Sequence, residues 1–135
     1  MMSKPLLIVA AAYLAVIGLA LLIVPVQFGV DAVPEDASAE LIALLRLLGG
    51  PFLGIAVLNW MSRDAAPATI RNTVILANLV GFATVALNDV WGVFSGDARD
   101  LAKMFLVVHL AFTVAFAVAW VRARGTATDS AIRHG

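Results

Sequence analysis

The chain has 135 residues, of which 62% are hydrophobic and 13% are charged, and its formal net charge is zero. A soluble domain has about 45–50% apolar and about 25% charged residues, so this composition excludes an ordinary soluble domain. The zero net charge argues against a nucleic-acid partner, and the absence of cysteine excludes disulfides, iron–sulfur clusters and thiolate zinc sites.

Four apolar segments account for the composition, and we expect them to form helices over residues 5–27, 39–61, 68–91 and 101–122. Each has about the 20 residues that cross a hydrocarbon core of about 30 Å as a helix. Helices are expected because backbone polar groups inside lipid must be satisfied within the chain. The short connections predict an all-α, four-transmembrane-helix up-down bundle, which forms one membrane domain over residues 1–135 with a polar tail at 123–135.

The ends of the first two segments carry local signals. Asp36 or Ser38 could cap the second helix. A signal peptide is the alternative for the first segment, with a small-residue cleavage context at residues 37–40. We expect a permanent helix instead, because the apolar run is long for a signal peptide and only Lys4 precedes it.

The loop charges are asymmetric and predict an orientation. Six basic residues fall on one side of the four segments, and the first loop on the other side carries acidic residues without a basic one. The positive-inside rule therefore places both termini in the cytoplasm, and we expect a bacterial cytoplasmic membrane protein. The tryptophans are expected at the membrane surfaces, with Trp60 and Trp120 on the cytoplasmic side and Trp91 on the outer side.

Small residues mark the expected helix contacts, because they let backbones approach closely in lipid. One stripe on the second segment and one on the third have this character: Ala39, Ala43, Arg46, Gly50, Gly54 and Val57, then Thr73, Ala77, Gly81, Thr84 and Asn88. We expect packing at Gly49, Gly50, Gly54 and Gly81.

A proline interrupts the second segment near its centre. Pro51 cannot donate the helical hydrogen bond, so we expect a kink at Gly50 and Pro51. The kink is interpreted as a packing bend, and a hinge that faces a ligand, as in transporters, is the alternative.

Several polar residues fall inside the apolar segments. Most of them are expected in the outer half of the membrane, because they lie few residues from the outer ends of their helices. We predict a ligand-binding or proton site from Arg46, Asn88, Asp89, His109 and Asn78. An intramembrane arginine needs a partner; Asp89 is our first choice, and Glu40 and Asp100 are the alternatives. The same set could instead only lock the helices together.

No metal, cofactor or catalytic residue is predicted. Bis-histidine haem needs two buried histidines, and His134 lies in the tail. No acidic pair or histidine pair has metal-ligand spacing within the membrane, and no glycine-rich phosphate loop follows a strand.

The segments RLLGGPFLGIAVLNW (residues 46–60) and WVRAR (residues 120–124) resemble a family of small bacterial four-helix membrane proteins that is catalogued as a domain of unknown function. Where those proteins have an aromatic residue before the double glycine, this chain has Leu47 and Leu48. The resemblance implies the four-helix architecture and supplies no catalytic residue.

Three classes of function stay open from the sequence. The first is a non-enzymatic subunit or a protein that binds a lipid or small molecule in a polar cavity in the outer half of the bundle. The second is a membrane enzyme that acts on a lipid or isoprenoid, and the third is an oligomeric transporter or channel. The expected partners are the lipid bilayer and a second copy of the chain or a larger membrane complex.

Overall fold

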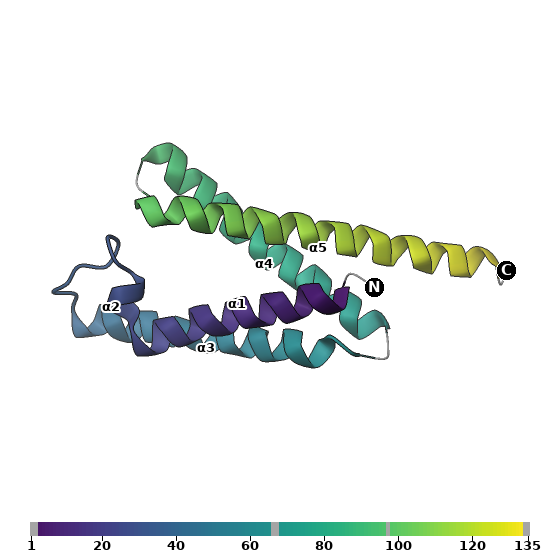
Figure 1. Ribbon diagram of the computed structural model, residues 1–135, viewed down its shortest axis with the longest axis horizontal. Helices are drawn as coiled ribbons and strands as arrows, with labels where there is room; N and C mark the ends of the chain where they lie inside the picture. The colour runs from purple at the N-terminus through teal and green to yellow at the C-terminus, as the bar shows by residue number, and fades with distance from the viewer. Residues whose placement is uncertain (1–2, 66–67, 97, 134–135) are drawn as a thin grey trace. The chain divides into compact units, whose positions relative to one another are not determined.

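The computed structural model describes the backbone of residues 3–65, 68–96 and 98–133, and all regular secondary structure in these ranges is helical. In chain order the helices are α1 (Ser3–Ile23), α2 (Pro25–Phe28), α3 (Ala39–Ser62), α4 (Ala68–Ser95) and α5 (Asp100–Arg133) (Figure 1). Within the described residues, α1, α3, α4 and the Asp100–Gly125 part of α5 are long and apolar enough to cross a membrane. The predicted all-α class and its four apolar helices are therefore confirmed, and they indicate a multi-pass membrane protein.

The ends of the first and last long helices differ from the predicted ones. The first helix stops at Ile23, and Pro25 begins the separate short helix α2, because a proline at a first helical position donates no hydrogen bond back into α1. The last helix continues to Arg133 through most of the predicted tail. The helix continues past the charged residues that end the apolar span, because no proline follows Pro67 to break it. Residues 134 and 135 of that tail lie outside the described residues.

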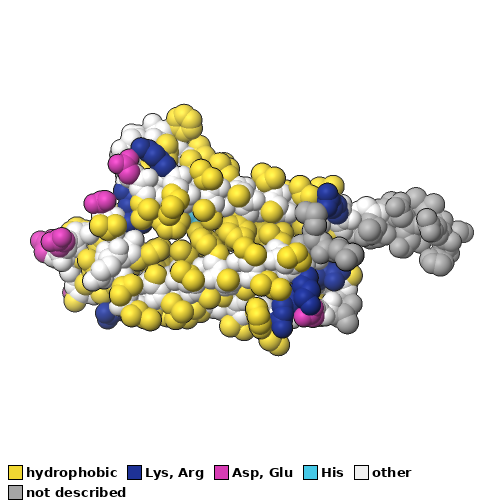
Figure 2. Space-filling model, viewed as in Figure 1, with side chains coloured by type: hydrophobic (Ala, Val, Ile, Leu, Met, Phe, Trp, Pro, Cys, Tyr) yellow, Lys and Arg dark blue, Asp and Glu magenta, His cyan; other side chains and the backbone are white. Residues whose placement is uncertain are grey.

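The chain divides into two compact units. The α1–α3 unit is Leu7–Arg63, and the α4–α5 unit is Asp64–Gly135 together with Met1–Leu6. Hydrophobic side chains cover much of the visible sides of the helices (Figure 2), as contact with lipid requires. The predicted up-down bundle, which would join both units, stays a prediction.

Two glycines hold the α1–α3 unit together. A Cβ added at Gly49 would lie 2.7 Å from the carbonyl oxygen of Gly18, and one added at Gly18 would lie 2.9 Å from the carbonyl oxygen of Gly49. The two backbones are thus in direct contact, and only a residue without a side chain fits at either position. Leu22 and Leu53 pack beside this contact, which gives the dispersion energy that drives helix association in lipid.

The face of α3 that contacts α1 is not the small-residue stripe that we predicted. All six members of that stripe are exposed, including Gly50 and Gly54, and a Cβ at either glycine would meet no atom within 4 Å. Gly49 lies about 100° around the helix from Gly50. The contact with α1 therefore uses Gly49 and Leu53, one turn apart, and leaves the Gly50 and Gly54 side uncovered.

Ser38 and Pro51 shape the course of α3. The Ser38 side chain accepts a hydrogen bond of 3.3 Å from the Leu41 N–H, so Ser38 is the N-cap, as one of the two predicted candidates. Pro51 lies inside α3, which is one continuous helical segment from Ala39 to Ser62. The kink at Gly50 and Pro51 stays a prediction.

The α4–α5 unit is a helical hairpin closed by a tight connection. Gly96 has φ +80°, a left-handed conformation that favours glycine, and the Ala98 N–H donates to the Gly92 carbonyl at 3.0 Å. Both features end α4 and turn the chain into α5, which packs along it. The buried side of α4 carries Val74, Ile75, Asn78, Phe82 and Ala86.

The predicted stripe on the third segment is again the exposed side. Thr73, Ala77, Gly81, Thr84 and Asn88 are all exposed. A Cβ at Gly81 would meet no atom within 4 Å, so the contact of α4 with α5 does not require a glycine there. The hairpin instead packs through larger side chains, because aromatic rings on both helices supply the contact area.

The glycine contact gives the first testable prediction. Gly49→Ala should lower the stability of the protein by about 1–3 kcal/mol, because the new methyl group forces two backbones apart. Thermal unfolding in a mild detergent, followed by circular dichroism, measures the change in Tm. Gly50→Ala is the matched control and should leave Tm unchanged or slightly raised. Equal losses for both variants would show that the contact face of α3 is wrongly assigned.

Candidate functional site

The structure brings two of the five predicted site residues together. Nδ1 of His109 on α5 lies 2.5 Å from Oδ2 of Asp89 on α4. The side chains are 13% and 15% exposed, respectively. Asp89 lies six residues before the end of α4, and His109 lies nine residues after the start of α5. At about 1.5 Å per residue, both lie roughly 9–14 Å along their helices from the connection that closes the hairpin.

A hydrogen bond between Nδ1 of His109 and Oδ2 of Asp89 requires that one of these two atoms carries a proton. An ionised carboxylate only accepts hydrogen bonds, so Nδ1 of His109 donates to Asp89 when the aspartate is charged. The carboxylate then fixes the orientation of the imidazole ring and which ring nitrogen carries the proton. Each side chain thus gives the other a hydrogen-bond partner in an apolar setting.

Aromatic rings surround the pair on the hairpin. The ring centroids of Phe82 and of Phe105 each lie 6.1 Å from that of His109. Phe82 also stacks on Phe112 at 4.5 Å and on Phe116 at 5.7 Å. Phe116 is fully buried, so these rings form the packed centre of the hairpin and keep the pair out of water.

The sequence carried a signal for these rings that we did not use. Phe105, His109, Phe112 and Phe116 recur at intervals of four, three and four residues, which is the period of one helix face. In the structure the Thr113 hydroxyl donates to the His109 carbonyl at 2.8 Å, a local contact within α5.

The two predicted asparagines of α4 do not join the pair. Asn78 is buried, its side-chain amide donates to the Val74 carbonyl at 2.8 Å, and it lies about 16 Å along α4 from Asp89. Asn88 is exposed, although it is adjacent to Asp89 in the chain. Arg46 belongs to the α1–α3 unit and is exposed on α3. The predicted ion pair of Arg46 with Asp89 would join the units and stays a prediction.

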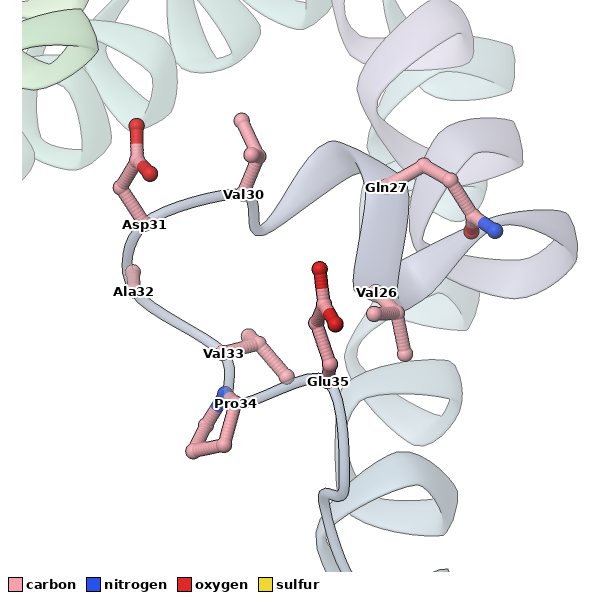
Figure 3. A pocket seen from close by; sticks show the side chains of 8 residues that line it. All are labelled: Val26, Gln27, Val30, Asp31, Ala32, Val33, Pro34 and Glu35. Atoms are coloured by element: carbon pink, nitrogen blue, oxygen red, sulfur yellow. The ribbon is translucent and has the colours of Figure 1, made fainter.

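A hollow lies in the loop between α1 and α3, at a place where no site was predicted. Its volume is about 640 Å³, and its lining comes from one stretch of chain between Val26 and Glu35 (Figure 3). Most of its side chains are apolar, and Asp31 and Glu35 supply carboxylates. Within the described residues, no group of three or more acidic, histidine or cysteine side chains could hold a metal ion. The aspartate–histidine pair is therefore the better candidate for chemistry.

The pair gives the second prediction, a double-mutant cycle with Asp89→Asn and His109→Gln. We expect a coupling energy of about 0.6–1.7 kcal/mol, the range of hydrogen-bonded pairs between membrane helices. Unfolding in a graded detergent titration measures it. The control cycle uses Asp100→Asn and Lys103→Gln, whose ion pair of 2.8 Å is largely exposed. That cycle should give less than about 0.5 kcal/mol. A coupling near zero for Asp89 and His109 would contradict the pair.

Arg46 gives the third prediction. If Arg46 pairs with Asp89 in the assembled protein, Arg46→Leu lowers Tm in detergent, because it leaves a buried carboxylate with one partner fewer. The same substitution in an Asp89→Asn background should then cost much less. An unchanged Tm for Arg46→Leu alone would contradict the ion pair.

Comparisons with protein-family models, with curated proteins and with solved structures find no match to this chain. The resemblance to the four-helix family of unknown function stays a prediction that depends on residues 46–60 and 120–124. The chemistry of the chain is therefore inferred from its own geometry, above all from Asp89 and His109.

Proposed function

We propose that this protein is a small, non-enzymatic protein of a bacterial cytoplasmic membrane that binds a lipid or another small hydrophobic molecule at the Asp89–His109 pair. The observation that carries this function is the 2.5 Å contact between the two side chains inside apolar, membrane-length helices. Ionisable groups are rare in such helices because lipid disfavours them, and those that occur are often functional.

The surroundings of the pair favour an amphipathic ligand. The phenyl rings of Phe82 and Phe105 flank the imidazole and offer contact area to an apolar molecule. The aspartate and histidine offer a carboxylate and an imidazole to one polar group of that molecule. A lipid with a hydroxyl or carbonyl group near its apolar part meets both requirements. Such a lipid can reach the pair from the surrounding bilayer by diffusing between the helices.

Loop charge supports the orientation that goes with this function. Acidic side chains gather over the loop between α2 and α3 (Figure 2), where the sequence has Asp31, Glu35 and Asp36. Arginines follow the apolar parts of α3 and α5. By the positive-inside rule, both termini and these arginines lie in the cytoplasm, and the Asp89–His109 pair lies in the outer half of the membrane.

An enzyme acting on a lipid or isoprenoid is the alternative, and one observation favours it. A histidine oriented by a carboxylate is the arrangement that general acid–base catalysis uses. In that function His109 and Asp89 exchange a proton with the substrate, and Arg46 binds an anionic group. Conversion of a co-purified lipid, rather than its simple retention, would distinguish this alternative.

Native mass spectrometry from a mild detergent tests the function and forms the fourth prediction. The wild-type chain should carry a bound molecule of defined mass, and Asp89→Asn and His109→Gln should each lose it, because each removes a charged or hydrogen-bonding group from the site. Asn88→Ala is the matched control, since Asn88 is exposed one residue away. The same spectra report the number of copies of the chain.

Retention of the same molecule in equal amounts by all four proteins would contradict a site at the pair. Binding lost equally in Asn88→Ala would point to a general weakening of the hairpin. Circular dichroism on each variant separates that outcome from the loss of a specific contact.

A further inference from the structure

An arginine packs against a tryptophan at the carboxyl-terminal end of two different membrane-length segments. At the end of α3, the guanidinium carbon of Arg63 lies 4.0 Å from the ring centroid of Trp60. Near the end of the apolar part of α5, that of Arg124 lies 5.7 Å from the ring centroid of Trp120. Each pair lies within one unit, so the two pairs are independent occurrences of the same arrangement.

This arrangement suits a cation at the depth of lipid headgroups. Tryptophan prefers the boundary between hydrocarbon and water, and half of the Trp60 surface is exposed. A cation–π contact orients the guanidinium without neutralising its charge. Arg63 also donates from Nη1 to the Trp60 carbonyl, which fixes the group further at the helix end. The guanidinium is therefore held in place at the end of the helix.

Guanidinium groups match phosphate, because their planar N–H donors bind two of its oxygens at once. We propose that the Trp60–Arg63 and Trp120–Arg124 pairs each bind the phosphate of an anionic phospholipid, of which phosphatidylglycerol is the simplest. These sites need only that the helices lie in a membrane. They are separate from the Asp89–His109 pair and do not depend on the function proposed for it.

The charge around the pairs favours an anionic lipid over a zwitterionic one. Arg122 is exposed two residues from Arg124, and Arg71 lies in the first turn of α4. The acidic Asp64, which follows Arg63, is held by Lys4 at 2.6 Å. At the connection between α4 and α5, Lys103 forms an ion pair of 2.8 Å with Asp100. An excess of basic groups near a membrane surface attracts anionic lipid.

The test, and the fifth prediction, compares lipid retention by the full chain. The protein is exchanged into mixed micelles with either phosphatidylglycerol or phosphatidylcholine, and native mass spectrometry counts the retained lipids over a lipid titration. The wild-type chain should bind phosphatidylglycerol more tightly. Arg63→Gln and Arg124→Gln should each weaken that binding about fivefold, and the double variant should nearly abolish the preference.

Lys103→Gln is the matched control, because it removes a basic charge that an aspartate already neutralises, and it should change binding less than twofold. Arg63→Lys keeps the charge and loses the planar donors, so it should bind phosphatidylglycerol less tightly than wild type and more tightly than Arg63→Gln. Inorganic phosphate added in excess should not displace the lipid, because it lacks the acyl chains.

Equal retention of both lipids by the wild-type chain would overturn the proposal, as would equal losses in Lys103→Gln and the arginine variants. Tm measured in phosphatidylcholine checks that every variant is folded, since none of these side chains is buried. Loss of the molecule bound at Asp89 and His109 with unchanged phosphatidylglycerol binding would contradict only the proposed function. The reverse result would contradict only the lipid sites.

Discussion

Hydrocarbon offers no hydrogen bonds, and this constraint decides where every polar group of the chain can be. The backbone meets it by forming helices, which satisfy their own N–H and carbonyl groups. The side chains meet it in two ways. Asp89 and His109 lie 2.5 Å apart inside a hairpin, where each group is the partner of the other. Arg63 and Arg124 lie near the ends of their segments and pack on the rings of Trp60 and Trp120.

Within this constraint, the two units pack by different means. The α1–α3 unit relies on a direct backbone contact at Gly18 and Gly49, so its helices approach as closely as the chain permits. The α4–α5 unit relies on large rings, with Phe82 of α4 stacked against Phe112 and Phe116 of α5. Close approach would leave no room for the imidazole and carboxylate, whereas helices spaced by phenyl rings accommodate them. The polar pair is thus found in the unit whose packing has room for it.

The Asp89–His109 pair and the arginine–tryptophan pairs differ in their surroundings. The pair lies among stacked rings, where a polar group of a ligand would find few competitors for its hydrogen bonds. The arginines pack on tryptophan rings near segment ends, and for them we propose the phosphates of anionic lipids as ligands. Sites for an embedded ligand and for surface lipids can therefore coexist in a small chain, because they use different depths.

The sequence by itself determined which segments of the chain form helices. Hydropathy and length identify four membrane-length helices, and Ser38 is recognisable as a cap, because capping and lipid solubility depend on residues that are neighbours in the chain. The sequence also singled out Asp89 and His109, since ionisable groups are conspicuous in apolar runs. The tertiary structure decided which faces meet. Gly49 rather than Gly50 contacts α1, and a phenylalanine face rather than a small-residue stripe joins α4 to α5. Lipid and protein interior are equally apolar, so hydrophobicity does not mark the inner face of a membrane helix, and only the fit of opposing side chains selects it.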